Sequence, residues 1–134
     1  MVRDLEPKAA ARGFTLIELV VVVTILGILV AIALPNYRAA IVQAKEAVLK
    51  EDLFRFRDTI DQYQADKGKY PASLDALVTD GYLRLIPKDP ITGQRDWVEV
   101  PAEAEPGSTD TPGVYDVHSG SEATGSDGTP YNEW

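Results

Sequence analysis

The sequence contains no cysteine and only one histidine, His118, among its 134 residues. Without cysteine the chain can form no disulfide, no thiolate nucleophile and no metal centre held by sulfur. A single histidine also makes a histidine-based metal site or a Ser-His-Asp triad improbable. We therefore interpret His118 as a structural or surface residue, and we expect a protein that is not an enzyme.

Positive charge is missing from the last 39 residues, which contain nine acidic residues and no lysine or arginine. The whole chain has 13 basic and 21 acidic residues, which gives a formal net charge of −8. A protein that binds nucleic acid directly needs basic side chains to neutralise the phosphates. The composition therefore argues against nucleic acid as a direct partner.

Apolar residues are concentrated in one run, FTLIELVVVVTILGILVAIAL, which covers residues 14–34 and has Glu18 as its only charge. As a helix this run would span about 30 Å, the thickness of the hydrocarbon core of a membrane. Arg3, Lys8 and Arg12 precede it, which favours a cytoplasmic amino terminus and an exported carboxyl-terminal part. The alternative is a buried core helix, although such a helix rarely has so long an apolar run.

The residues at the start of this run, RGFTLIEL at positions 12–19, resemble the class III signal of type IV pilins and of type II secretion pseudopilins. The resemblance implies that prepilin peptidase removes residues 1–13 as a leader, cuts after Gly13 and methylates the new amino group of Phe14. Removing 13 residues from 134 leaves a mature chain of 121. The sequence PNYR after the run is unlike an ordinary signal-peptidase site, so we expect the apolar helix to remain as an anchor.

Glu18 places a carboxylate one helical turn inside the apolar run. At the centre of a bilayer such a charge costs about 2.5–3.5 kcal/mol, and less near the interface, so it is usually paired. After cleavage the available cation is the amino group of Phe14, which a neighbouring subunit could offer more directly than the same chain. The resemblance implies this intersubunit pairing, so we expect Glu18 to act in assembly. The alternative is that Glu18 only extends to the lipid headgroups.

Helical periodicity continues past Pro35, where we expect a kink because proline removes one backbone donor. Two apolar stripes follow, about 100° apart around the helix: first Tyr37, Ile41, Ala44 and Val48, then Leu49, Leu53, Phe56, Ile60 and Tyr63. We interpret the first stripe as a contact with other subunits and the second as a contact with the chain's own head. The alternative is one curved helix that packs continuously on one domain.

Gly68 predicts the end of the helix, which would then cover residues 14–66. We divide it into a transmembrane and filament-core part, 14–35, and an amphipathic part, 36–66. The remainder, 67–134, has shorter elements: a helix from Ser73 to Val78 with Ser73 as its cap, and strands at 97–100 and 114–117 joined by a polar loop. The predicted head is therefore a small globular α+β unit.

The head sequence KGKYPASLDALVTDGYLRLIPKDPITG, followed by Trp97 and Tyr115-Asp116-Val117, is similar to the major, G-type pseudopilins of type II secretion systems. The resemblance implies an α+β, pilin-like fold: a long amino-terminal helix packed on a small antiparallel β-sheet with a loop-rich carboxyl terminus. It also implies a structural subunit of a periplasmic pseudopilus that polymerises to drive protein export. The alternatives are a type IV pilin or minor pilin of a surface filament, for adhesion, motility or DNA uptake, and a tethered periplasmic enzyme.

The resemblance implies several partners and a location. The partners would be further copies of the chain, minor pseudopilins, prepilin peptidase, the inner-membrane assembly platform with its secretion ATPase, and membrane lipid before assembly. The chain would cross the bacterial inner membrane once, with its amino terminus in the cytoplasm and its head in the periplasm.

Major pseudopilins typically bind calcium in the carboxyl-terminal loop, and on this chain the resemblance carries that role to Ser119 and Asp127. Calcium prefers six to eight oxygen ligands, and a small domain without disulfides often needs such a staple. The stretch from Ser119 to Trp134 is shorter and less acidic than the family's usual loop and has no EF-hand spacing. The alternative to calcium is a loop held by the packing of Tyr131 and Trp134 onto the sheet.

Overall fold

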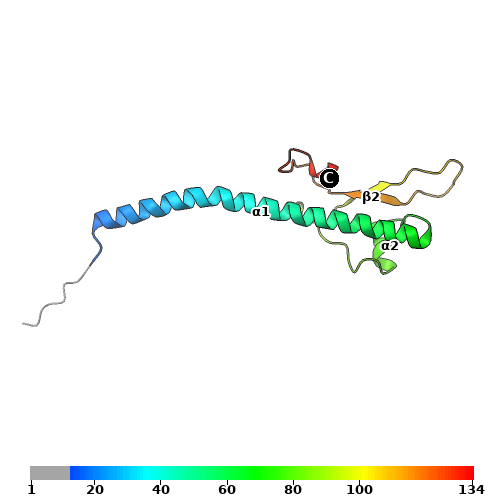
Figure 1. The fold of residues 1–134 in the computed structure, drawn as a ribbon, viewed down its shortest axis with the longest axis horizontal. Coiled ribbons are helices and arrows are strands. Elements are labelled where there is room, and N and C mark those ends of the chain that lie inside the picture. The colour runs from blue at the N-terminus through cyan, green and yellow to red at the C-terminus, as the bar shows by residue number, and fades with distance from the viewer. Residues whose placement is uncertain (1–12) are drawn as a thin grey trace, which may run out of the picture. The chain divides into compact units, whose positions relative to one another are not determined.

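A computed structural model describes residues 13–134, so residues 1–12 of the expected leader lie outside the described residues (Figure 1). The elements in chain order are α1 (Leu16–Lys67), α2 (Leu74–Thr79), β1 (Val98–Pro101), β2 (Val114–His118) and the 3-10 helix η1 (Tyr131–Glu133). The chain divides into two units, one ending at Arg38 and the other covering Ala39–Trp134. The long amino-terminal helix and the small antiparallel sheet confirm the predicted α+β, pilin-like fold.

Thr15 caps the start of helix α1, a role that the helical periodicity of the sequence did not predict. The Thr15 hydroxyl accepts a hydrogen bond of 3.2 Å from the Glu18 N–H, and the Thr15 carbonyl accepts one of 3.1 Å from the Leu19 N–H. The helix therefore begins at Leu16, two residues after the predicted start at Phe14. It continues through Pro35, which does not end it, and the kink expected there stays a prediction.

Helix α1 ends at the predicted glycine. Gly68 has φ of 71°, a left-handed conformation that favours glycine, and its N–H donates to the Gln64 carbonyl at 2.8 Å. The last helical residue is Lys67, one position beyond the predicted end at 66. The sequence therefore located this end of the helix to within one residue.

The second unit has a hydrophobic core that α1 lines on one side. The buried residues come from α1, from α2, from the sheet region and from the carboxyl-terminal segment: Leu49, Leu53, Phe56, Ile60, Tyr63, Leu74, Leu77, Trp97, Val114, Val117 and Tyr131. Phe56 and Trp97 meet edge to face with ring centroids 5.0 Å apart, and the Trp97 indole N–H donates to the Pro87 carbonyl at 2.7 Å. Full burial of each large apolar side chain stabilises the fold by about 1.5–3 kcal/mol, so this core holds the head together.

Strands β1 and β2 form a two-stranded antiparallel sheet in which Val98 pairs with His118 and Val100 with Asp116. The register shifts between Val100 and Pro101, where the long connection to β2 begins. Val114 and Val117 are buried, whereas Tyr115 between them is exposed. The two buried valines are three positions apart, which strict alternation would not give, and the irregular register between them interrupts the alternation.

Helix α2 begins after Ser73, as predicted, but the predicted capping role of the Ser73 side chain is wrong. The side chain of Ser73 makes no cap hydrogen bond, and the Leu74 N–H instead donates to Glu99 Oε1 at 3.0 Å. A carboxylate on β1 thus satisfies a free N–H at the start of α2. This contact joins α2 to the sheet across 25 positions of the chain.

Candidate functional site

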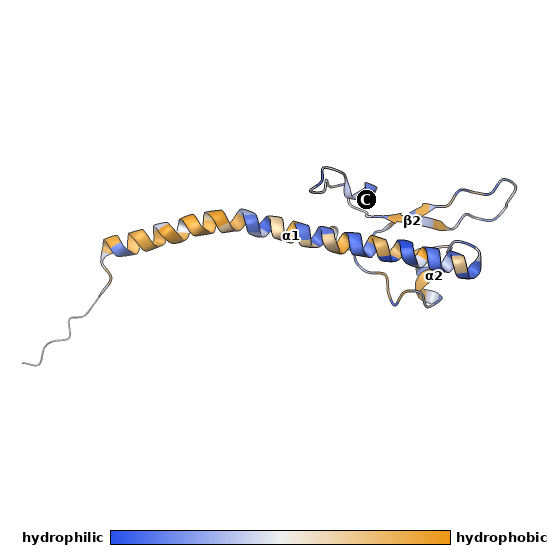
Figure 2. Ribbon diagram, in the orientation of Figure 1, coloured by the Kyte–Doolittle hydropathy of each residue, from blue (hydrophilic) through white to orange (hydrophobic). Residues whose placement is uncertain are grey.

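The apolar residues in the first half of α1 have no cover from any other part of residues 13–134. Between Phe14 and Leu34 the large apolar side chains are 43–81% exposed, and Figure 2 shows this half of α1 coloured almost entirely as hydrophobic. The most apolar window of α1 has a mean hydropathy of 3.0 and none of it is buried, so the helix is long and apolar enough to cross a membrane. A surface this apolar requires lipid or another protein around it.

The residues expected to be processed lie at the exposed start of this helix. Gly13 is exposed, and apart from its chain neighbours no described residue comes within 4 Å of the place where a Cβ would stand; the next residue, Phe14, is 81% exposed. Glu18 is also exposed, and its main-chain N–H is the donor to Thr15. The capping role of Thr15 was not predicted from the sequence, although the spacing Thr15-x-x-Glu18 is typical of a capping box.

The two stripes on α1 have different surroundings. The second stripe is buried in the head, with each of its five residues at most 5% exposed. Tyr37, Ile41 and Val48 of the first stripe are 66%, 38% and 50% exposed, and Ala44 is exposed as well. Continuous packing of the helix on one domain is therefore wrong for Ile41, Ala44 and Val48. The first stripe remains available to another molecule.

Glu46, three positions before Leu49 on α1, is a buried carboxylate, only 5% exposed. Its Oε1 accepts hydrogen bonds from the Ser126 N–H at 2.7 Å and from the Tyr131 hydroxyl at 2.8 Å, and its Oε2 accepts one from the Ser126 hydroxyl. The hydrogen bonds from Ser126 hold the pKa of the Glu46 carboxyl below its ordinary value, although burial acts in the opposite direction. An anchoring contact of this kind, with partners 80 and 85 positions away, has no local sequence signal.

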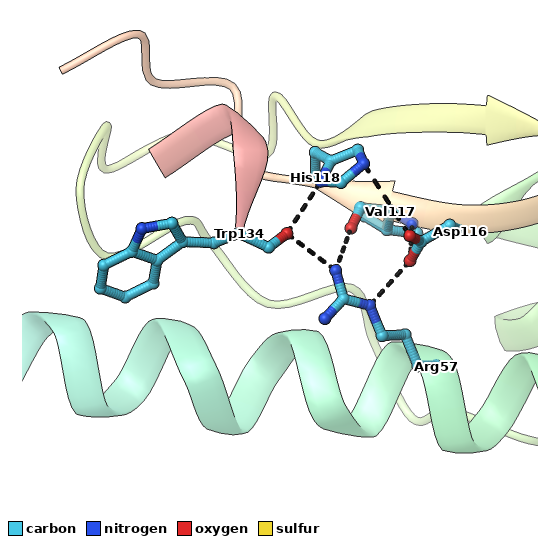
Figure 3. Close-up of polar contacts among 5 residues, drawn as sticks. All are labelled: Arg57, Asp116, Val117, His118 and Trp134. Carbon is cyan, nitrogen blue, oxygen red and sulfur yellow. Dashed lines mark hydrogen bonds and ion pairs between the residues drawn. The ribbon is translucent and has the colours of Figure 1, made fainter. Parts of the chain in front are cut away.

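Arg57 makes a second set of contacts with the carboxyl-terminal part of the chain (Figure 3). Its Nε donates to Asp116 Oδ1 at 2.7 Å, and its Nη2 donates to the main-chain oxygen of Trp134 at 2.8 Å and to that of Val117 at 3.4 Å. The His118 ring contacts the same Trp134 oxygen through Nδ1 at 2.8 Å, and its Nε2 lies 3.8 Å from Asp116 Oδ2. His118 thus lies in a structural network, in keeping with its interpretation from the sequence.

The two residues expected to bind calcium are engaged with different partners. Ser119 is completely buried, and its hydroxyl donates to the buried carboxylate of Asp89. Asp127 is exposed, and its Oδ1 accepts from the Thr129 N–H at 2.9 Å and from the Thr129 hydroxyl at 2.7 Å. These contacts with Thr129 hold the pKa of Asp127 below its ordinary value.

Asp52 borders a surface hollow that Arg55, Tyr82 and Arg84 also line. Burial raises the pKa of the Asp52 carboxyl, and the charge of Arg55 partly opposes that change. A raised pKa beside a hollow is a common feature of catalytic acids. The described lining of this hollow, however, holds no histidine, serine or lysine that could act with Asp52 as nucleophile or base. We therefore interpret the pKa of Asp52 as a consequence of packing.

Comparison with known proteins places these features in a family. The sequence family described as the prokaryotic N-terminal methylation motif matches residues 8–34. The type II secretion system core protein G of Vibrio cholerae is 33% identical over 134 aligned positions, which cover 86% of this chain and 88% of that protein. No solved structure matches the chain significantly.

Further relatives carry the same name. Core protein G of Klebsiella michiganensis is 32% identical over 102 positions, covering 64% of this chain and 72% of the relative. That of Pseudomonas aeruginosa is 40% identical over 94 positions, covering 58% of this chain and 66% of the relative. Together with the apolar, uncovered start of α1 and the small α+β head, these similarities show that the chain belongs to the family of type II secretion system core protein G, the major pseudopilins.

Proposed function

We propose that this chain is a structural subunit of a type II secretion pseudopilus and that it polymerises through α1 to drive protein export. The observation that carries the proposal is the contrast between the two units. The apolar first half of α1 has no cover from the residues that the structure describes, whereas the head has its own closed core. A chain of this kind gains stability by surrounding its exposed helix with lipid first and with copies of the same helix later.

Processing at the start of the chain would prepare this helix for assembly. Prepilin peptidase would cut after Gly13 and methylate Phe14, and the exposure of both residues supports access by the enzyme. Before assembly the subunit would cross the bacterial inner membrane once, with its amino terminus in the cytoplasm and its head in the periplasm. Arg3, Lys8 and Arg12 support this orientation because basic residues flank a span on its cytoplasmic side.

Glu18 would set the position of one subunit against the next. In an apolar helix bundle a carboxylate is costly unless a cation is near it, and the methylated amino group of Phe14 in a neighbouring copy would supply that cation. The start of α1 at Leu16 leaves Phe14 outside the helix. Its amino group therefore does not take part in the hydrogen bonds of the helix and can face a neighbour.

The first stripe on α1 would extend the contact between subunits beyond the membrane. Ile41, Ala44 and Val48 are exposed and lie on the part of the helix that belongs to the head unit. Minor pseudopilins, the assembly platform and the secretion ATPase would complete the machinery in which the filament grows. The described residues offer support for the contacts between copies, through the exposed apolar surface of α1.

Replacement of Glu18 by valine in a secretion-competent cell tests the proposal. We expect Glu18→Val to lose residues 1–13 and gain a methyl group, as measured by intact mass, but to form no filament and to stop secretion. Glu51→Val is the matched control, because Glu51 is an exposed glutamate of the same helix outside the apolar run, and it should assemble normally. Normal filaments from Glu18→Val would contradict the pairing, and a wild-type chain that keeps its leader would contradict the processing.

A further inference from the structure

The carboxyl-terminal segment of the head, residues 119–134, is held in place with little regular secondary structure. Within it the structure describes one bridge, between Thr124 and Pro130, and the three-residue helix η1. Tyr131 is nevertheless 5% exposed and belongs to the core, and it meets Trp134 edge to face at 5.0 Å. Gly125 lies so close to Trp134 that a Cβ there would stand 2.6 Å from the indole ring. A segment packed so closely without a ladder needs attachment at specific points.

Both attachments come from one side of α1. Glu46 and Arg57 are eleven positions apart, which is about three helical turns, so their side chains leave the helix in nearly the same direction. Glu46 receives three hydrogen bonds from Ser126 and Tyr131, and Arg57 donates to Asp116 and to the main-chain oxygens of Val117 and Trp134. The acidic side chain therefore holds the segment at Ser126 and Tyr131, and the basic side chain holds its residue Trp134 and the strand just before the segment, each through charge-assisted hydrogen bonds.

The residues to which the resemblance carries a calcium site do not fit that ion. Calcium needs six to eight oxygen ligands at 2.3–2.6 Å. The Ser119 hydroxyl is buried, donates to Asp89 and accepts from the Ser121 N–H at 3.2 Å. Asp127 Oδ1 is occupied by both donors of Thr129. Over residues 13–134, moreover, no three histidine, aspartate or glutamate side chains gather as they do in a metal site.

The turn that contains Asp127 closes on itself instead of opening around an ion. The Gly125 N–H donates to the Thr129 carbonyl at 2.8 Å, and the Trp134 indole N–H donates to the Thr129 hydroxyl at 2.8 Å. Oxygen atoms that a calcium loop would direct at the metal are here acceptors for protein donors. Asp127 Oδ1, the Thr129 hydroxyl and the Thr129 carbonyl therefore each have a partner within the chain.

We infer that Glu46 and Arg57 fasten the carboxyl-terminal segment directly, in the place to which the resemblance carries a calcium site, and that the head of this chain folds without a divalent cation. This inference concerns the stability of the purified subunit and does not depend on whether the subunit forms a filament.

Thermal unfolding of the full chain in detergent micelles tests the inference, followed by near-ultraviolet circular dichroism of the aromatic core. For a site filled at a hundred times its dissociation constant, calcium would raise Tm by roughly 10 °C. We expect Tm to be the same, within about 1 °C, in a calcium chelator and in excess calcium chloride. A calcium-dependent rise of Tm in the wild-type chain would overturn the inference.

Two matched variants show which side chains fasten the segment. Glu46→Gln keeps the shape of the side chain but cannot accept from all three donors, and it should lower Tm by the same amount with and without calcium. Asp127→Asn, whose amide oxygen can still accept from Thr129, should leave Tm nearly unchanged in both conditions. If Glu46→Gln does not fold, Ser126→Ala serves in its place, because it removes the hydroxyl that donates to Glu46 Oε2 and keeps the main-chain N–H that donates to Oε1. An unchanged Tm in the Glu46 or Ser126 variant, or a calcium effect that Asp127→Asn abolishes, would contradict the inference.

Discussion

The hydroxyl of Tyr131 donates a hydrogen bond of 2.8 Å to the carboxylate of Glu46, which stands 85 positions earlier in the chain. Both groups are 5% exposed, so each excludes water from the other. The contact joins the part of α1 where the head begins to the helix η1 near Trp134. It makes the stability of the head sensitive to the protonation of one carboxylate and one phenol.

The stability of the head should therefore depend on pH. The pKa of Glu46 is held below its ordinary value of 4.5, chiefly by Ser126, so between the two values the unfolded chain binds more protons than the folded chain. The stabilisation is complete above about pH 4.5 and is lost as the pH falls through the lowered pKa. Unfolding by urea between pH 3 and 7 should show this loss, and Glu46→Gln should flatten the profile. An equally steep profile in that variant would contradict the assignment.

Tyr131 should make the head less stable at high pH, whereas Glu46 makes it less stable at low pH. Burial, followed by the hydrogen bond to Glu46, raises the pKa of the Tyr131 hydroxyl above its ordinary value of 10.0. The folded chain then keeps a proton that the unfolded chain has released, so this stabilisation is complete below about pH 10 and is lost as the pH rises through the raised pKa. Tyr131→Phe removes the hydroxyl group that titrates. Its unfolding free energy should be lower than that of the wild type at pH 7, and the difference should shrink above pH 10.

Two neighbouring phenylalanines on α1 give a direct test of which face the head covers. Phe56 is 1% exposed and Phe54 is 65% exposed. Phe56→Ala should lower the free energy of unfolding by about 3–5 kcal/mol, because it removes a large buried side chain and leaves a cavity. Phe54→Ala should change it by no more than about 0.5 kcal/mol. Similar losses in the two variants, measured by urea unfolding, would show that the helix is rotated differently in solution.

Two arginines offer a matched comparison for the attachment of the carboxyl-terminal segment. Arg57→Met should cost about 1–3 kcal/mol, because Asp116 and the main-chain oxygen of Trp134 each lose a charged donor. Arg55→Met should cost only about 0.3–0.5 kcal/mol, because its pair with Glu51 is exposed and within one helical turn. Limited proteolysis should release the segment faster in the Arg57 variant alone. Equal cleavage rates would contradict the role of Arg57.

The first stripe on α1 can be tested apart from the stability of the head. Val48 is 50% exposed, and Ala47 is exposed one position earlier, about 100° away around the helix. Val48→Asp should leave Tm and processing nearly unchanged but abolish filaments, because it puts a charge into an apolar contact between subunits. Ala47→Asp introduces the same charge outside the stripe and should assemble. Electron microscopy of both variants tests this prediction, and filaments from Val48→Asp would show that the first stripe lies outside the interface between subunits.

The sequence predicted those parts of the fold that have a local pattern. The run of apolar residues, the two stripes and Gly68 placed α1 within two residues of its observed ends. The contacts that hold the head closed could not be predicted, because their partners lie far apart in the chain. Glu99 caps α2 across 25 positions, and Arg57 reaches Trp134 across 77. The four-residue spacing of Glu46 and Lys50 is typical of an exposed ion pair on a helix, whereas Glu46 is buried and accepts a hydrogen bond from Tyr131.

The long separation between Glu46, Arg57 and their partners has a consequence for synthesis. A nascent chain cannot complete these contacts until the ribosome has added the residues up to Trp134. Closing loops of this length is entropically costly and slow, so the head must wait for its last residues before it closes. Subunits truncated before this segment would expose the core to proteases, and degradation would then remove them before they reached a growing fibre.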